Sequence, residues 1–524
     1  MALLVLSVGL VAFAILWQAS GQRPVAEQAL ARGQLGSGRV LRAVTQLGQM
    51  GVTIDPRVFS GNPRSVAGLL SYSRTVGDKR DAVFPSTQFV ADVLGDVPAH
   101  DLLSVALDPR DWRGDHGLFD NSHKRGKNWE RGACVSLFSG GKLVTESTVG
   151  LRIHGGMSRR AGEKSLRIYL AEEFGSSVVC GDLLPGAVGN SLVVHNDQRR
   201  MKFCNPISYE LMGMLGCDIP RTRPMRVMVN GEMMRRTYFL SEHLSDSYVE
   251  TKLGHKHFVR IDEQGGHHAQ YDRTFALLKY GGPSLDDVAR VLDVEDLMAW
   301  LTGVLFCAPY DCRQGVAYYN SRDQRWRWVI WDLDWSFGPW PERVDGSRIE
   351  DRSITAYLRH PWGDIRTLLF DRRMPIAGEF RARLLARISR SLNHEVTPEW
   401  CDALIEKYRG IARSYSPGSR GAEQNLDAIA AFMKARPKLL REELNEEFAV
   451  GPVYSCTVRV PKSASVTIDG HEYRADWLGH YFAGQEVTVA AGPGYGVAVD
   501  GVAVAGQVWR GVIVANTVVE VIRR

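Results

Sequence analysis

The pattern of apolar and polar residues divides the chain into regions that predict different secondary structure. Short apolar stretches separated by polar, glycine-rich loops predict strands at Leu102–Leu107, Ala133–Phe138 and Lys142–Ile153. Asn230-Gly231, a sequence typical of a tight hairpin turn, joins two further candidate strands. This part of the chain is therefore expected to be rich in β-structure.

Helical patterns dominate residues 351–448. Apolar residues recur there at helical spacing, as in Leu404–Tyr415 and Ala428–Phe448. From residue 451 the pattern changes to short alternating strands with frequent glycine. That change predicts a small all-β domain of the sandwich type at residues 451–524.

The stretch Val304–Gly338 combines the end of a helix, a loop and an aromatic segment. The helix is predicted to begin at Asp293, a suitable N-cap residue. The following loop, Cys307–Gln314, holds the acidic residue Asp311. Trp326–Trp335 is dense in tryptophan and β-branched residues, which predicts a strand.

One face of this predicted strand ends in two carboxylates. Because side chains alternate along a strand, Asp332 and Asp334 would share a face with Trp326, Trp328 and Ile330. Residues two apart lie roughly 7 Å from each other, and two anions beside aromatic rings are costly without a cation. We therefore expect a divalent metal here, although a lone aspartate at a strand end is usually a turn residue.

A second candidate site lies in Gly150–Leu170, where two predicted strands flank a loop that contains Ser158 and Arg159. Lys164 falls on the apolar face of the second strand, which is costly unless the ammonium reaches water or an anion. A phosphate would satisfy this lysine, and the glycine-rich loop backbone can hold another. A simply solvated lysine remains the alternative. Glu210, on a predicted helix, is available to pair with a lysine.

Composition narrows the class of protein. The 524 residues include 44% hydrophobic and 23% charged residues, as in folded soluble domains. This length predicts about two to four domains. The net charge is only +5 and arginines are spread along the chain, so nothing favours nucleic acid as a partner.

The N-terminus has a different character. Ala2–Trp17 is almost entirely apolar, and the first charged residue is Arg23. Residues 1–22 therefore predict a signal peptide or signal anchor, and hence an exported, extracytoplasmic or membrane-anchored protein. A buried N-terminal helix is the structural alternative. Residues 23–83 are weakly periodic and predict a helical or loosely ordered stalk.

Eight cysteines show neither a CxxC motif nor a zinc-binding spacing. They are too few for a disulfide-built scaffold in a chain of this length. Cys307 and Cys312 flank the Asp311 loop and can pair, but packing is the simpler role for them.

Several separated motifs together carry a family resemblance. They are Asn128-Trp129-Glu130-Arg131, Arg152-x-His154-Gly155-Gly156-x-Ser158-Arg159, Lys164-Ser165-Leu166, Val229-Asn230-Gly231-Glu232 with Glu242, Asp311, and Trp331-Asp332-x-Asp334-x-x-Phe337-Gly338. In their order and spacing, the chain resembles the CotH family of atypical secreted protein kinases, first associated with bacterial spore coats.

The resemblance implies an α+β protein with three folded regions. A divergent two-lobed protein-kinase-like core would occupy residues 84–345, with a helical C-terminal extension at 346–450. The small β-sandwich-type domain at 451–524 resembles accessory domains of exported bacterial proteins.

The resemblance also implies ATP and Mg²⁺ or Mn²⁺ as cofactors. Lys164 would contact the ATP phosphates with Glu210 as its partner, while Asp311 would be the catalytic acid and Asp332, with Asp334, would bind the metal. The remaining cofactor-binding candidates in the matching motifs are Arg152, Ser158, Arg159 and Glu242.

One departure from the family pattern bears on activity. The asparagine that tends to follow the catalytic aspartate is missing, and Gln314 is the residue that can replace it. The first interpretation is a metal-dependent kinase that phosphorylates Ser or Thr of exported proteins on a cell or spore surface. The alternative is a non-catalytic CotH-like surface or structural protein. A glycosidase using Asp332 and Asp334 is disfavoured, because two acids on one strand face cannot easily flank a sugar ring.

Overall fold

The computed structural model describes residues 72–76, 79–83, 100–140, 142–174, 176, 178–196, 203–230, 232–262, 269–280, 284–309, 316–338 and 375–524. The chain folds into two units. We call the first the barrel unit; it comprises Met1–Gln198, Pro220–Lys256 and Gly410–Ser419. We call the second the helical unit; it comprises Arg199–Ile219, His257–Arg409 and Arg420–Arg524. The predicted leader, residues 1–22, lies outside the described residues.

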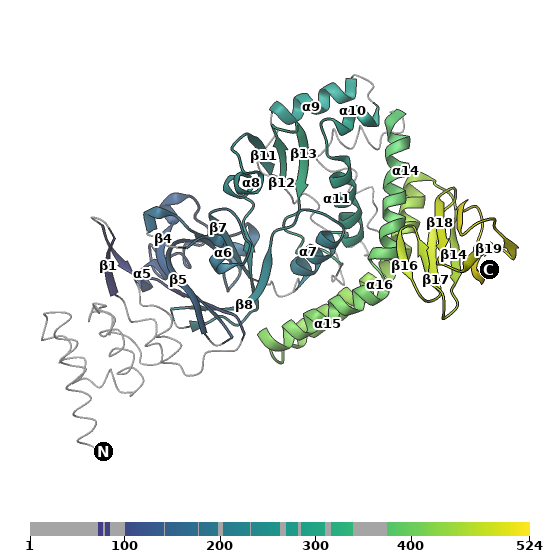
Figure 1. Cartoon of the computed structure of the whole chain (residues 1–524). Coiled ribbons are helices and arrows are strands. Elements are labelled where there is room, and N and C mark those ends of the chain that lie inside the picture. Colours follow the sequence, from purple (N-terminus) through teal and green to yellow (C-terminus); the bar gives the residue numbers. More distant parts are fainter. Residues whose placement is uncertain are drawn as a thin grey trace, which may run out of the picture. The chain divides into compact units, whose positions relative to one another are not determined.

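A closed sheet forms the barrel unit (Figure 1). Its strand order is β10-β7-β6-β5-β4-β3-β8-β9, and β10 also pairs with β8, which closes the barrel. Neighbouring strands are antiparallel except for the parallel pair β3–β8. The strands are β3 (Leu102–Ala106), β4 (Arg131–Ser139), β5 (Lys142–Ile153), β6 (Leu166–Tyr169), β7 (Ser191–Asn196), β8 (Thr222–Val229), β9 (Glu232–Met233) and β10 (Tyr238–Glu242).

Alternation along the strands decides which side chains fill the barrel. In β6, Leu166 and Ile168 are buried in the core, whereas Arg167 and Tyr169 face the other side. The predicted Asn230 turn is present, with φ of 48° at Asn230 between β8 and β9. Short helices connect the strands: α5 (Pro109–Trp112), η3 (Lys127–Trp129), η4 (Met157–Arg160), η5 (Glu172–Phe174), α6 (Cys180–Leu183) and α8 (Asp246–Leu253).

A hairpin precedes the barrel in sequence. Strands β1 (Tyr72–Val76) and β2 (Lys79–Val83) pair antiparallel. The sequence pattern predicted a helical or loosely ordered stalk over residues 23–83, so these two strands are a difference from that expectation. A two-stranded hairpin of this length carries too few alternating positions to stand out from the sequence.

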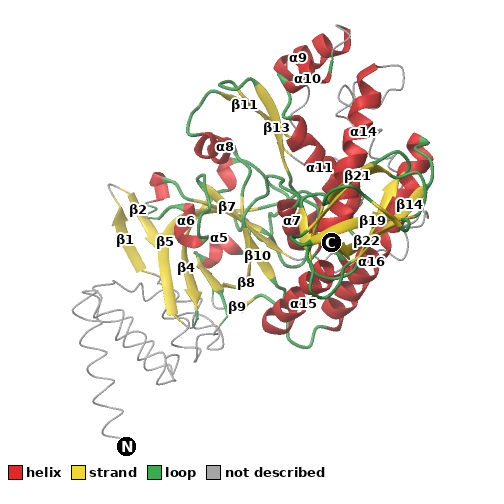
Figure 2. Ribbon diagram, turned by 45° about the vertical axis from the view of Figure 1, so that its right-hand side comes forward, coloured by secondary structure: helices red, strands yellow, loops and turns green. Residues whose placement is uncertain are grey.

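Up to residue 448, the second unit consists mainly of helices together with one small sheet (Figure 2). The sheet has the order β11-β12-β13, from β11 (Phe258–Asp262), β12 (Val316–Asn320) and β13 (Arg325–Val329). The helices are α7 (Cys204–Met214), α9 (Ala269–Tyr280), α10 (Leu285–Ala289), α11 (Val294–Cys307), α14 (Pro375–Arg390), the π-helix η7 (Ser391–Glu395), α15 (Pro398–Tyr415) and α16 (Arg420–Phe448). As predicted, Asp293 caps α11, accepting a hydrogen bond from the backbone N–H of Asp296 at 3.2 Å.

The predicted strand Trp326–Trp335 is wrong beyond Val329, where β13 ends. Asp332 has a φ of 56°, in the left-handed region, so side-chain alternation does not continue through it. Asp332 and Asp334 therefore lie in the turn that follows the strand. The prediction that they share one face of a strand, roughly 7 Å apart, is wrong. Directly after Val329, the backbone N–H of Ile330 donates to the carbonyl of Asp218 at 3.1 Å.

The last domain of the helical unit is built from two sheets that share one hydrophobic core. Their orders are β17-β14-β22-β19-β20 and β16-β15-β18-β21. The strands are β14 (Val453–Arg459), β15 (Val466–Ile468), β16 (His471–Tyr473), β17 (Trp477–Phe482), β18 (Glu486–Ala491), β19 (Tyr495–Val499), β20 (Val502–Ala503), β21 (Val508–Val512) and β22 (Thr517–Arg523). We call residues 451–524 the β domain.

Two general features of the described residues bear on the sequence analysis. None of their helices is both long enough and apolar enough to span a membrane. The described cysteines are buried free thiols, including Cys307, while Cys312 lies outside the described residues. The described thiols therefore serve packing.

Candidate functional site

A basic pocket opens on the outer face of the barrel, above strands β5 and β6. Its volume is about 160 Å³. The polar and charged residues that line it are Asn121, Lys124, Arg125, Arg152, His154, Arg159 and Arg167, and the aromatic ones are Trp129 and Tyr169. Positive charge gathered around aromatic faces suits a ligand that has both anionic and planar parts.

Strand register places two arginines of this pocket side by side. Arg152 of β5 is directly opposite Arg167 of β6, and like charges in that position repel. Their guanidinium carbons lie 4.3 and 4.4 Å from the centre of the Tyr169 ring, and Arg152 also forms an ion pair with Glu130. Arg167 donates a hydrogen bond to Ser191 Oγ at 3.2 Å. Two cationic side chains are therefore adjacent on this face of the barrel, and Glu130 pairs with Arg152.

Arg159 holds the loops around the pocket together. Its guanidinium donates to the carbonyls of Ile153, Gly155, Ser122 and Lys124. These bonds tie the end of β5 to the segment that carries Lys124 and Arg125. Arg159 thus lines the pocket while also shaping it.

Ser158 sits against the turn at Gly155, where φ is 102°. A Cβ atom on Gly155 would come within 1.9 Å of Ser158 Oγ, so only glycine fits. Lys164 is 8% exposed and donates to the carbonyls of Arg159 and Ala161 at 2.8 and 2.7 Å. The lysine predicted to meet a phosphate thus bonds to the backbone of the loop that carries Arg159.

His154 lies among these cations. Burial, and then the positive charges of His195, Arg167 and Arg159, lower the pKa of His154 to about 3. Its ring meets that of His243 edge to face, with centroids 5.9 Å apart. His154 is therefore neutral at physiological pH. The positive charge of the pocket comes from its arginines and from Lys124.

Two further predicted ligands have structural partners. Glu242 is 2% exposed, and its carboxylate accepts the backbone N–H groups of Val188 and Arg221, each at 2.7 Å. Glu210 accepts from Lys407 Nζ at 2.7 Å and from the Tyr408 hydroxyl at 2.6 Å. Glu210 belongs to the helical unit and Lys164 to the barrel unit, so their pairing stays a prediction.

The turn after β13 brings two carboxylates together within the helical unit. One oxygen of Asp332 and one of Asp334 lie within 4.8 Å of each other, and Asp334 is 8% exposed. The hydroxyl oxygen of Tyr209, on α7, accepts a hydrogen bond from the backbone N–H of Asp332 at 3.1 Å. Burial, and then the charges of Asp332 and Asp334, raise the pKa of Tyr209, which keeps the phenol neutral.

These two carboxylates fit a hard divalent cation. Such ions prefer oxygen ligands, and a cation removes the repulsion between two close, largely buried anions. Asp311 and Gln314, the predicted catalytic residues, lie outside the described residues.

Sequence reasoning missed several pocket residues: Arg125, Trp129, Arg167 and Tyr169. Arg167 and Tyr169 had a usable signal, since they alternate with Leu166 and Ile168 along β6. Trp129 belongs to a family motif quoted above, but neither it nor Arg125 was assigned to a site, because both are distant in sequence from β5 and β6. Tyr209 was missed for the same reason.

Comparison with known proteins defines the class. The family model described as "CotH kinase protein" matches residues 151–281 and 283–446, more than half of the chain. The chain therefore belongs to the CotH kinase family, as its sequence motifs indicated.

Other comparisons add little. None of the curated proteins matches the chain. Among solved structures, the chain is similar to the Helicobacter pylori proinflammatory kinase CtkA, with 8% identity and a TM-score of 0.26 over 49% of this chain and 91% of that one. A likeness this weak carries no argument about the site. The α+β class itself follows from the elements described above.

Proposed function

We propose that this protein is a metal-dependent kinase that transfers the γ-phosphate of ATP to serine or threonine of an exported or surface protein. The observation that carries the proposal is the cross-strand pair Arg152–Arg167 in the basic pocket. A polyanion stabilises two guanidinium groups that lie opposite each other, and the triphosphate chain of a nucleoside triphosphate is such a polyanion. Family membership supports the same chemistry.

The pocket residues have distinct tasks in this proposal. Arg152 and Arg167 bind phosphate oxygens, and exposed Arg125 adds charge at the pocket's edge. Trp129 and Tyr169 offer aromatic faces for a base or ribose. Lys164 acts through the loop, since it fixes the carbonyls of Arg159 and Ala161.

Asp332 and Asp334 would hold Mg²⁺ or Mn²⁺. A cation bound there would neutralise charge on the phosphates during transfer. Asp311 would orient and accept the proton of the substrate hydroxyl, and Gln314 would replace the missing asparagine. By the same proposal, residues 84–345 form a divergent two-lobed kinase core, which residues 346–450 extend.

We further propose that the protein works outside the cytoplasm. The apolar Ala2–Trp17 stretch supports export or membrane anchoring. The β domain then serves as an accessory module, and the substrate is a protein of the cell or spore surface.

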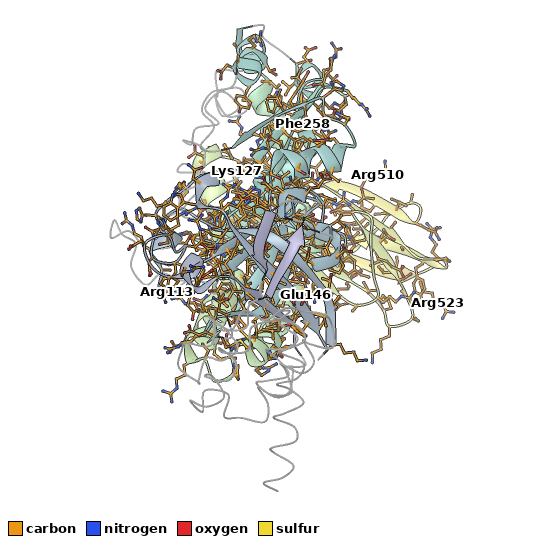
Figure 3. All side chains as sticks on the ribbon, turned by 90° about the vertical axis from the view of Figure 1, so that its left-hand side faces the viewer. Arg113, Lys127, Glu146, Phe258, Arg510 and Arg523 are labelled. Carbon is orange, nitrogen blue, oxygen red and sulfur yellow. The ribbon has the colours of Figure 1, made fainter. Side chains whose placement is uncertain are left out.

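The test begins with nucleotide affinity. ATP binding to the full chain is measured by calorimetry with EDTA, with Mg²⁺ and with Mn²⁺. We expect tighter binding with either metal, and Arg125→Gln should weaken it about tenfold, as the loss of one charge-assisted contact predicts. Arg510→Gln is the matched control, because this arginine is exposed on β21 of the β domain (Figure 3). Absence of ATP binding in the unmodified protein would overturn the proposal.

Phosphate transfer is tested separately. With radiolabelled ATP, we expect label on serine or threonine of the protein itself or of an exported substrate. Asp311→Asn should abolish transfer and leave ATP affinity unchanged. ATP binding with no transfer under either metal favours the non-catalytic alternative, for which the missing family asparagine is the specific argument.

A further inference from the structure

The carboxylates of Asp332 and Asp334 converge where the backbone turns after β13. Asp332 has a φ of 56°. The left-handed region is unfavourable for non-glycine residues, although aspartate tolerates it better than most, so contacts around Asp332 help to hold this conformation. An extended chain would instead separate the two residues by roughly 7 Å.

The segment after the turn is held from several sides. Leu333 is 1% exposed and Phe337 is fully buried. The Phe337 backbone N–H donates to the carbonyl of Cys307 at 2.9 Å, and that of Ser336 donates to Leu333 at 3.2 Å. These contacts fix Leu333–Phe337, the segment directly after Asp332.

Tyr209 is placed to hold the backbone of Asp332. Its side chain is 3% exposed, so the phenol has little freedom to move. Its oxygen receives the backbone N–H of Asp332, the residue with the left-handed conformation.

We propose that Tyr209 is a positioning residue for the cation site, and that its hydroxyl holds the Asp332 turn so that Asp332 and Asp334 face one ion. The inference rests on the proposed function in one respect, that these carboxylates bind a divalent cation. In this proposal Tyr209 acts through the backbone of Asp332, whose N–H group its hydroxyl oxygen accepts.

The first experiment measures Mn²⁺ affinity in the full chain without nucleotide, from the loss of the free-ion signal in electron paramagnetic resonance. Partners that orient metal ligands typically account for about 10- to 100-fold in affinity. We expect Tyr209→Phe to weaken Mn²⁺ binding by about that factor. Equal Mn²⁺ affinity in folded Tyr209→Phe and in the unmodified protein would overturn the proposal.

Tyr481→Phe is the matched control. Tyr481 is likewise 3% exposed, and its hydroxyl donates to Asp469 at 2.7 Å within the β domain. Both substitutions remove one buried hydroxyl and lower stability, but only Tyr209→Phe should change Mn²⁺ affinity. An equal loss of Mn²⁺ affinity in the two variants would contradict a positioning role.

A second measurement covers the case in which Tyr209→Phe does not fold. 3-Fluorotyrosine placed at position 209 alone keeps the hydroxyl and gives one ¹⁹F resonance. We expect that resonance to shift as Mg²⁺ fills the site, while the same label at position 481 stays unchanged. No shift at saturating Mg²⁺ would overturn the inference.

If Asp332 and Asp334 bind no divalent cation, so that the proposed function itself is wrong, the measurements give a different result. In that case the unmodified protein and Asp332→Asn bind Mn²⁺ equally weakly, and no label responds. A wrong assignment of Tyr209 alone leaves Mn²⁺ binding sensitive to Asp332→Asn but not to Tyr209→Phe.

Discussion

The carboxylate of Asp296, on α11, accepts the backbone N–H of Trp328, on β13, at 2.8 Å. This contact joins the helix to the strand that precedes the turn with Asp332 and Asp334. Burial, and then the charges of Asp218 and Asp293, raise the pKa of Asp296 from 3.8 to about 7, although the bond to Trp328 opposes the shift.

The raised pKa predicts that Asp296 makes stability fall as pH rises. The folded state keeps the proton between the unfolded pKa of 3.8 and about 7, so the favourable contribution is complete below about pH 4 and is lost by about pH 7. Asp296→Asn keeps an oxygen for Trp328 and removes the charge. We expect the variant to be more stable than the parent by up to about 4 kcal/mol at pH 8 and nearly equal at pH 4.

Urea midpoints measured from pH 4 to 8 check this prediction. Asp286→Asn, an exposed change on α10, should leave the pH profile unaltered. Parallel profiles for Asp296→Asn and the parent would show that Asp296 titrates at an ordinary pKa.

Lys164 is predicted to stabilise the protein. The sequence indicated that Lys164, on the apolar face of a strand, would be costly unless its ammonium reached water or an anion. Two backbone carbonyls satisfy the ammonium instead. Methionine leaves both carbonyls without this donor, at a cost of about 1–3 kcal/mol, and loosens the loop that carries Arg159.

Thermal unfolding and ATP titration test the Lys164 prediction together. Both the melting temperature and ATP affinity should fall in Lys164→Met, whereas Lys462→Met, an exposed change in the β domain, should alter neither. A more stable Lys164→Met would mean that the ammonium is not bonded as described.

Asp332 and Asp334 are predicted to contribute unequally to metal-dependent ATP binding. Asp332→Asn should abolish the difference between EDTA and Mg²⁺ titrations, because a neutral amide replaces the principal ligand. Asp334→Asn should reduce that difference without removing it. Circular dichroism of both variants should match the parent, and an unchanged metal effect in Asp332→Asn would exclude it as the ligand.

Asn393 is predicted to couple the β domain to the helices. This π-helix residue exchanges hydrogen bonds with the backbone of His480 at 3.0 and 3.1 Å and accepts from Arg441 at 2.9 Å. Asn393→Ala leaves a buried arginine without one acceptor, so we expect a loss of about 2–4 kcal/mol. Calorimetry should then show residues 451–524 unfolding in an earlier, separate transition. Gln507→Ala, exposed in the same domain, is the control and should leave a single transition.

The sequence by itself determined the local elements and the family. Short apolar stretches between glycine-rich loops predicted β3, β4 and β5, helical spacing predicted α15 and α16, and Asp293 marked the start of α11. These features depend on residues near each other in the chain. The family motifs are also short segments whose order can be seen in the sequence, and the family model confirms the CotH kinase family that they indicated.

Only the tertiary structure decided how these elements form sites. Closure of the barrel through β8 and β10, and the Arg152–Arg167 register, depend on pairing between distant strands. The strand predicted through Asp334 stops at Val329, and the left-handed backbone at Asp332 breaks its alternation, which no local pattern reveals. Tyr209 meets Asp332 for the same reason: two residues 123 positions apart become neighbours only when the core packs.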